Sequence, residues 1–264
     1  MIICDTVGGL NNRLRCLVSC MRIDDDIKLI WTVKETSVWL WCSFADLFSN
    51  GIEEFGSKED CFKKYPNVKS YSSCEFIELP GDGMNINHLN FDNWNNSIPD
   101  NLKESVLEQI NKLKPIKYIS DVVSKFEPKL GDDTVTFSIR TWKDAERNEA
   151  SNGRFFEIDT VFSEMDDEIY TDKRFFVTCD HQETFDKILD RYGDKIIYTP
   201  KRTFFGDYET VEGIQDSVID LLLGGKSNLI VNSSNSSFCD MQWWFGGGKA
   251  NIKIMKNHPN KRFV

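Results

Sequence analysis

The stretch IICDTVGGLNNRL, residues 2–14, decides the fold class of this chain. A short apolar run at residues 2–6 predicts a strand, and the pair Gly8-Gly9 predicts a tight loop after it. Apolar side chains then recur at the spacing of a helix: Leu14, Leu17, Val18 and Met21. Residues 27–33 form a second apolar strand candidate. The chain therefore opens as a βαβ unit, which predicts a parallel sheet.

The same alternation resumes in the second half of the chain. Strands are predicted at 134–140, 174–178, 195–199 and 228–232, and helices at 182–192, 213–223 and 236–245. Between the two alternating regions, residues 51–100 read as irregular, with a strand candidate at 73–79. Two helices, the first opened by Pro99-Asp100 and ended by Pro115, are predicted up to residue 126. The segment 127–133 reads as a domain boundary.

We therefore expect an α/β protein with two Rossmann-like domains facing a cleft. Residues 1–130 would form an N-terminal, acceptor-side domain, and residues 131–264 a C-terminal, nucleotide-sugar-binding domain. The last basic residues are expected to cross back onto the first domain: Lys253, Lys256, Lys261 and Arg262.

Composition excludes several classes of protein. Of 264 residues, 40% are hydrophobic and 28% are charged, so a sizeable core can form and disorder is excluded. The net charge of −10 disfavours nucleic acid and anionic lipid as partners of the whole chain. No apolar run reaches the roughly 18 residues of a membrane span, and no signal-peptide pattern opens the sequence, which predicts a cytoplasmic protein. The eight cysteines show no CxxC pair and are expected to be reduced core thiols.

The first glycine loop is an anion-site candidate. It lacks the third glycine and the later acidic residue of a dinucleotide fingerprint. Backbone N–H groups at a helix start nonetheless favour an anion, and Asn11, Asn12 and Arg13 would add donors. The alternative is that Gly8 and Gly9 only permit a tight turn. A second glycine pair, at residues 224–225, is no P-loop, because Asp220 stands where the first glycine is required.

Arg140 follows an apolar strand and is the second candidate. Ligands of open α/β sheets bind outside the carboxyl ends of strands, and a guanidinium binds phosphate bidentately. The alternative is a surface ion pair with Asp144 or Glu146.

The third candidate comprises Asp216, Asp220 and the loop NSSNSSF at residues 232–238. Ser236 or Ser237 is expected to cap the helix that follows, and hydroxyl and N–H groups at one helix start also suit a diphosphate.

These signals, in this order, resemble the fucosyltransferase superfamily that includes nodulation fucosyltransferases, α1,6-fucosyltransferases and protein O-fucosyltransferases. The resembling pieces are residues 8–14, 137–140, 218–223 and 236–238. The resemblance implies a metal-independent GT-B transferase without a cofactor. Its donor would be a nucleotide diphosphate sugar, GDP-linked and fucose-like by resemblance.

The resemblance also implies residue roles. Arg140 would hold the β-phosphate and stabilise the leaving group, Asp220 would contact the base, and Ser236 and Ser237, next to Phe238, would contact the phosphates. The glycine loop would face the same diphosphate from the first domain through Gly8, Gly9, Asn11, Asn12 and Arg13. Candidates for the acceptor's general base are Asp5, Asp144, Glu146 and Glu149.

Several alternatives stay open. Ser138 stands where the family often has histidine, which leaves the base open between GDP, UDP and dTDP. The acceptor is a hydroxyl of a glycan, a protein or, for a viral source, a modified DNA base. A catalytically inactive binding module of the same fold is the second hypothesis. A nucleotide-sugar epimerase or dehydrogenase is disfavoured because the dinucleotide fingerprint fails and Tyr-x-x-x-Lys is absent. The run Asp24-Asp25-Asp26 precedes a strand rather than following one, so it does not predict a metal site.

Overall fold

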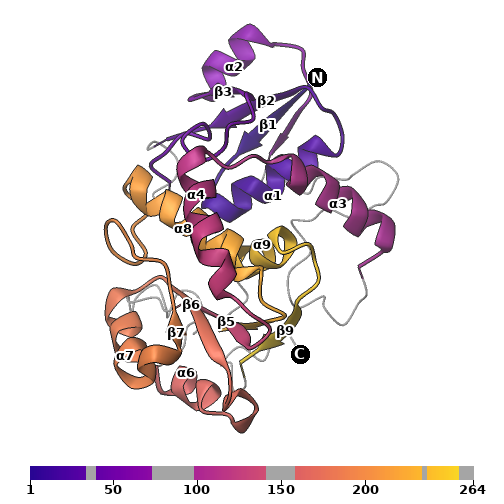
Figure 1. Ribbon diagram of the computed structural model, residues 1–264. Helices are drawn as coiled ribbons and strands as arrows, with labels where there is room; N and C mark the ends of the chain where they lie inside the picture. Colours follow the sequence, from indigo (N-terminus) through magenta and orange to yellow (C-terminus); the bar gives the residue numbers. More distant parts are fainter. Residues whose placement is uncertain (34–39, 73–97, 141–157, 234–236, 256–264) are drawn as a thin grey trace. The chain divides into compact units, whose positions relative to one another are not determined.

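The computed structural model describes residues 1–33, 40–72, 98–140, 158–233 and 237–255 (Figure 1). The chain forms two compact units, each made of two segments. Unit 1 comprises Met1–Ile119 and Tyr208–Gln215, and unit 2 comprises Ser120–Asp207 and Asp216–Val264. The expected division after residue 130 differs from this one, because residues 120–130 group with unit 2 and residues 208–215 group with unit 1.

Unit 1 contains a four-stranded sheet in the order β3-β2-β1-β4, and all of its strand pairs are parallel. Its strands are β1 (Ile2–Thr6), β2 (Ile27–Trp31), β3 (Glu53–Phe55) and β4 (Ser70–Ser72). Its helices are α1 (Leu10–Met21), α2 (Lys58–Lys64) and α3 (Asp100–Lys112). The βαβ unit predicted at the start of the chain is confirmed.

The two faces of β1 pack against different helices because successive side chains of a strand point to opposite faces. Ile3 packs with Cys61 of α2, whereas the Cys4 thiol contacts Cys16 of α1. Helix α1 is buried along almost its whole length, since every residue from Leu10 to Met21 except Asn12 is buried.

Unit 2 contains a five-stranded parallel sheet in the order β7-β6-β5-β8-β9. Its strands are β5 (Thr134–Ile139), β6 (Arg174–Cys179), β7 (Ile196–Ile197), β8 (Leu229–Asn232) and β9 (Asn251–Ile254). If β5 is counted as strand 1 and β9 as strand 5, the order across the sheet is 3-2-1-4-5. This is the order of a doubly wound nucleotide-binding sheet.

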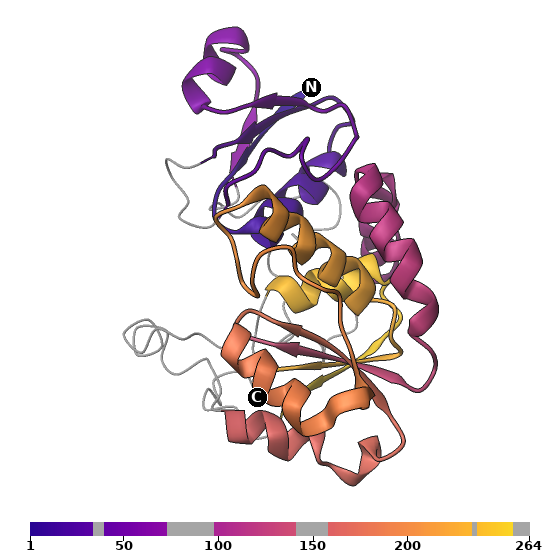
Figure 2. The ribbon, with the colours of Figure 1, turned by 60° about the vertical axis from the view of Figure 1, so that its left-hand side comes forward.

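Helices cover both faces of the second sheet. They are α4 (Lys117–Phe126), α6 (Ile158–Met165), α7 (Gln182–Tyr192), α8 (Val211–Gly224) and α9 (Ser237–Phe245). Short 3-10 helices follow α4, α6 and α7: η3 (Glu127–Lys129), η4 (Glu168–Tyr170) and η5 (Gly193–Lys195). In both ribbon views α6 and α7 lie over one face of the sheet, and α9 and most of α8 lie over the other (Figures 1 and 2).

Strand β5 separates an apolar layer from a polar one. Val135, Phe137 and Ile139 belong to the core cluster that includes Phe185 of α7 and Val161 of α6. The intervening residues are hydroxylic and point the other way. Among them, Thr136 donates to the carbonyl of Gly224 at the end of α8, at 2.9 Å, and Ser138 accepts from Cys239 of α9 at 3.0 Å. The face toward α8 and α9 is therefore held by hydrogen bonds as well as by burial.

Two sequence-based expectations were wrong. Residues 251–254, which include Lys253, form strand β9 and pair in parallel with β8 of unit 2, so this piece does not cross back onto the first unit. Lys256, Lys261 and Arg262 lie outside the described residues. The segment 51–72 is not irregular, since it holds β3, α2 and β4.

The strand candidate at 73–79 also lies outside the described part of the chain. Within the part that is described, none of the helices has the length and apolar character required to cross a bilayer.

Candidate functional site

Arg140 and Ser233 meet where the order of the second sheet reverses. Arg140 directly follows β5 and Ser233 directly follows β8, the neighbouring strand. The backbone N–H of Arg140 donates to the Ser233 hydroxyl at 2.7 Å, and the Ser233 N–H donates to the Ser138 carbonyl at 3.0 Å. Ligands of open α/β sheets bind at such a switch point, outside the carboxyl ends of the strands. We take this edge of unit 2 as the candidate site.

The Arg140 side chain lies at this edge and is 30% exposed, with Nε 3.7 Å from an oxygen of Asp180. Asp180 directly follows β6, the strand on the other side of β5. The ion pair expected as the alternative role of Arg140 involved Asp144 or Glu146, both of which lie outside the described residues. Asp180 is the carboxylate that the structure places beside the guanidinium. Arg140 thus presents a partly exposed guanidinium beside the Asp180 carboxylate.

Helix α9 begins just beyond β8. Its first two residues, Ser237 and Phe238, are partly exposed, and Ser236 lies outside the described residues. The first turn of a helix carries backbone N–H groups without helical partners, and the helix dipole favours an anion there. Arg140 follows β5, and Ser237 starts α9 after β8, the strand that pairs with β5. Both residues therefore belong to the same edge of unit 2. Capping by Ser236 or Ser237 stays a prediction.

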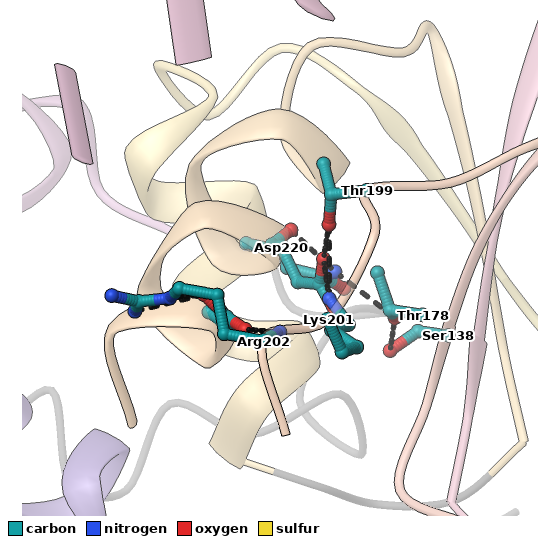
Figure 3. A network of polar contacts seen from close by, with 8 residues as sticks. Ser138, Thr178, Thr199, Lys201, Arg202 and Asp220 are labelled. Carbon is teal, nitrogen blue, oxygen red and sulfur yellow. Dashed lines mark hydrogen bonds and ion pairs between the residues drawn. The ribbon is translucent and has the colours of Figure 1, made fainter. Parts of the chain in front are cut away.

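A buried polar layer lies beneath this edge and comprises Ser138, Thr178, Asn232, Cys239 and Gln242. The Cys239 sulfur lies 3.0 Å from the Ser138 hydroxyl and 2.8 Å from the Asn232 side-chain oxygen, and its single proton serves one of these two contacts at a time. Thr178 donates to Ser138 at 3.3 Å, and Gln242 donates to Thr178 at 3.4 Å (Figure 3). Burial raises the pKa of Cys239, so the thiol keeps its proton and remains a donor. The layer ties α9 to the ends of β5, β6 and β8.

Asp220 of α8 forms a buried ion pair with Lys201. The two side chains are 7% and 8% exposed, and the Lys201 nitrogen lies 2.5 Å from Asp220 Oδ1. The Thr199 hydroxyl donates to the same oxygen at 2.7 Å (Figure 3). Desolvation raises the pKa of Asp220, and the charge of Lys201 opposes that shift.

The role expected for Asp220, contact with a nucleotide base, is not favoured by this placement. Its carboxylate is nearly inaccessible and is committed to Lys201 and Thr199, so it anchors α8 to the segment after β7. Asp216, one turn earlier on α8, is similarly engaged, because its carboxylate accepts from the backbone N–H and the guanidinium of Arg202 (Figure 3).

The glycine loop of unit 1 has the conformation that its sequence requires. Gly8 has φ +84°, a left-handed value that side chains disfavour. Gly9 occupies the N-cap position of α1, and no side chain caps it. Asn12 is exposed, whereas Asn11 is buried and its side-chain oxygen has no hydrogen-bond partner among the described residues. Gly8, Gly9 and Asn12 thus remain candidates for binding an anion.

Arg13 has a different role from the one expected. Its side chain is fully buried, and it donates to the carbonyls of Gly8 at 2.8 Å and Thr32 at 3.0 Å. Its guanidinium also lies 5.1 Å from the centre of the Trp31 ring, and burial lowers the pKa of Arg13 to about 10. Because two of its donor atoms bind backbone oxygens in the core, Arg13 braces the glycine loop and does not serve as an exposed anion ligand.

Of the four carboxylates that are candidates for the general base, Asp5 alone belongs to the described residues. Asp5 is buried in β1 and forms an ion pair with Lys58 of α2. Asp144, Glu146 and Glu149 lie outside the described residues, so their role stays a prediction.

The residues at 24–26 form separate contacts rather than a shared carboxylate site. Asp24 pairs with the amino terminus, Asp25 with Lys112 and Asp26 with Lys28.

The glycine pair that imitates a P-loop serves packing. A Cβ atom on Gly225 would lie 2.2 Å from the carbonyl oxygen of Gln242 and 2.7 Å from the nitrogen of Gly246. The absence of a side chain therefore lets the end of α8 approach the end of α9. The glycine pair is therefore explained by packing rather than by phosphate binding in a P-loop.

Sequence reasoning missed Asp180 and the Lys201–Asp220 pair. Asp180 could have been found by the argument that selected Arg140, because it directly follows an apolar strand. Nothing near Lys201 signals a buried lysine. Its partner lies 19 residues away, and the pairing depends on how α8 returns to the sheet.

The fold matches solved fucosyltransferases. A NodZ α-1,6-fucosyltransferase soaked with GDP-fucose has a TM-score of 0.54, with 13% identity over 92% of this chain and 91% of that one. The fucosyltransferase NodZ from Bradyrhizobium gives 0.53, with 13% identity over 91% of both chains. POFUT1 in complex with GDP gives 0.51, with 15% identity over 97% of both chains. No protein-family model and no curated protein matches the sequence.

These comparisons confirm the expected fold class. The chain has a mixed α/β, GT-B-like fold with two parallel sheets, and it is similar to the solved fucosyltransferases over more than nine-tenths of its length. With 12–15% identity, the likeness concerns the fold.

Proposed function

We propose that this protein is a glycosyltransferase that moves a sugar from a nucleotide diphosphate donor to a hydroxyl acceptor. The observation that carries the proposal is the position of Arg140. It is a partly exposed cation at the switch point of a doubly wound sheet, beside Ser233 and close in the topology to the start of α9. Solved structures of similar fold include a NodZ soaked with GDP-fucose and POFUT1 in complex with GDP, which supports a GDP-linked, fucose-like donor.

The chemistry of this site suits the departure of a diphosphate. As the bond between sugar and phosphate breaks, negative charge develops on the leaving oxygen, and a fixed cation with N–H donors lowers that barrier. Arg140 supplies the cation in the proposal, and the first turn of α9, with Ser236 and Ser237, supplies donors. Asp144 and Glu146 are the proposed candidates for deprotonating the acceptor.

The supporting framework explains why Arg140 could act without rearrangement. Its backbone is hydrogen-bonded to Ser233, and the strands on either side of it are joined by the polar layer. A pre-organised donor does not have to be reoriented during the reaction, and this is the source of its catalytic advantage.

Titration calorimetry with GDP, UDP and dTDP tests the binding part of the proposal. We expect one of the three diphosphates to bind, and binding to weaken when Arg140 is replaced. Hydrolysis or transfer of the matching nucleotide sugar then separates an active transferase from a binding module of the same fold. Failure of all three diphosphates to bind would contradict the proposal.

The proposed mechanism needs no metal ion, because Arg140 and the α9 amides would neutralise the leaving group. Turnover should therefore persist in excess chelator. Loss of transfer on chelation and its recovery with manganese would overturn this part of the proposal.

A further inference from the structure

Three thiols gather in unit 1 and take no part in the chemistry proposed above. Cys4 lies on β1, and Cys16 and Cys20 lie one turn apart on α1, which packs on the face of β1 that Cys4 occupies. All three side chains are completely buried. The sulfur atoms of Cys4 and Cys16 are 3.6 Å apart, and all three sulfur atoms lie within 4.8 Å of one another.

This cluster is unlike the other described cysteines. Cys42, Cys61, Cys179 and Cys239 do not join a group of this kind in the part of the chain that the structure covers. The spacing along the sequence, with eleven residues between Cys4 and Cys16 and three between Cys16 and Cys20, matches no zinc motif. The group exists because the fold brings a strand residue against one side of a helix.

The separations fit a metal ion bound by three sulfurs. With metal–sulfur bonds of about 2.3 Å, three sulfurs in a trigonal plane around an ion lie about 4.0 Å apart. The observed separations, from 3.6 Å to at most 4.8 Å, bracket that value. Small rotations of the side chains would therefore complete the geometry without moving β1 or α1.

Ligand type and burial together select the ion. Thiolate sulfur is a soft ligand that favours monovalent copper, zinc or iron–sulfur clusters. Structural zinc is almost always four-coordinate, and among the described residues the group offers three ligands. Complete burial of those ligands argues against water as a fourth one. The cluster therefore suits an ion that binds three sulfurs and no water, and monovalent copper is such an ion.

We propose that Cys4, Cys16 and Cys20 form a binding site for monovalent copper in the core of unit 1. Binding forms copper–sulfur bonds to the three side chains, and each thiol that becomes a thiolate releases its proton to solvent. No change of oxidation state is involved. The site would be loaded during folding or through local opening of unit 1, because the folded cluster is closed to solvent.

The test is reconstitution of the fully reduced protein with monovalent copper in the absence of oxygen, both in the folded state and during refolding. Copper retained against a chromogenic copper(I) chelator is then counted. We expect about one ion per chain, three sulfur neighbours in X-ray absorption, and a higher melting temperature for the loaded protein. Copper bound through nitrogen or oxygen, or no copper retained after refolding, would overturn the proposal.

Variants make the test specific. Cys4→Ala, Cys16→Ala and Cys20→Ala should each abolish retention of copper and its effect on the melting temperature. Cys61→Ala is the matched control, because Cys61 is also fully buried in unit 1 but lies outside the cluster, and it should retain copper. The site would be refuted if Cys61→Ala lost as much copper as Cys16→Ala, or if Cys20→Ala still retained copper. If a cluster variant does not fold, the sulfur count of the wild-type protein decides.

Discussion

Arg140 combines a fixed backbone with a guanidinium that keeps part of its surface in solvent. Its amide is tied to Ser233, and its side chain has Asp180 at 3.7 Å, a separation longer than a direct hydrogen bond. Arg13 shows the opposite arrangement, since its guanidinium is fully buried against backbone carbonyls. Exposure therefore separates an arginine that can bind a ligand from one that holds a loop.

Replacement of Arg140 by lysine tests the role of its planar, bidentate guanidinium while it keeps the charge. We expect Arg140→Lys to lower turnover of the nucleotide sugar by about 100-fold, equivalent to about 2.7 kcal/mol, because one pre-organised donor is lost. The melting temperature should change little. Arg191→Lys is the matched control, since Arg191 forms an exposed ion pair with Asp166 on the same unit. Unchanged turnover in Arg140→Lys would remove Arg140 from the mechanism.

The Lys201–Asp220 pair should matter for stability. In Lys201→Met the carboxylate of Asp220 stays buried and loses its counter-charge, which we expect to cost about 3–5 kcal/mol at neutral pH. The double variant with Asp220→Asn should recover part of that loss. Urea unfolding of the two variants at pH 7 measures both effects. A loss below about 1 kcal/mol in the single variant would mean that solvent reaches the pair.

The loss of stability in Lys201→Met should be smaller in acid than at pH 7. Burial already raises the pKa of Asp220, and removal of Lys201 takes away the charge that opposes this shift. The folded state then binds a proton at a pH where the unfolded carboxyl, with a pKa of about 3.9, does not. Stability of Lys201→Met relative to wild type should therefore rise as pH falls through the raised pKa of Asp220 toward about 4. A relative stability that is flat with pH would contradict this cause.

At the scale of elements, strands and helices with strong patterns could be predicted from the sequence, and short or charged ones could not. Helix α7 has the predicted bounds, Gln182–Tyr192, because its apolar residues recur at helical spacing and Gly193 ends it. Strand β9 carries Asn251 and Lys253 and no apolar run. Its place in the sheet comes from backbone pairing with β8 and from the contacts of Lys253 with Glu164 and Tyr170. Strand β3 has three residues, two of them glutamates.

The candidate site was partly predictable for the same physical reason. Arg140 follows a strand with a clear apolar pattern, and the rule for carboxyl ends of parallel strands then selects it. The burial of Asp220 and Arg13 depends on which side of each helix faces a sheet, and local sequence does not specify the neighbour that a polar side chain meets there. Both residues therefore have structural partners that sequence reasoning did not anticipate.

The contact between the ends of α8 and α9 gives a prediction at this scale. We expect Gly225→Ala to destabilise the protein by at least about 1–3 kcal/mol, because the added Cβ would lie 2.2 Å from the Gln242 carbonyl oxygen. Gly56→Ala is the control, since nothing lies within 4 Å of a Cβ at Gly56. Its effect should stay within about 0.5 kcal/mol. Equal midpoints for the two variants in urea unfolding would show that α8 and α9 can separate freely.

At the scale of the whole molecule, charge restricts the partners. The chain carries 42 acidic and 32 basic residues, and its net charge of −10 repels other polyanions. A small diphosphate can still bind at a local cation such as Arg140, because the repulsion of distant exposed charges is screened beyond about 8 Å at physiological ionic strength.

Duplex DNA should therefore fail to bind at physiological salt, whereas the matching nucleoside diphosphate should raise the melting temperature. Fluorescence anisotropy with a labelled duplex, and thermal unfolding with GDP, UDP or dTDP, measure the two outcomes. Tight DNA binding would favour a modified DNA base as acceptor and would require a basic surface that the net charge does not indicate.

The two units are interleaved along the chain, which passes between them after residues 119, 207 and 215. Neither unit can therefore be encoded as one uninterrupted gene fragment. A fragment ending at residue 119 would lack the 208–215 segment, where the Gln215 side chain donates to the Asp46 carbonyl at 2.7 Å. A fragment starting at residue 131 would lack the part of α4 that groups with unit 2. Dissection of this protein into independently expressed halves would thus require circular permutation or a spliced insert rather than a single truncation.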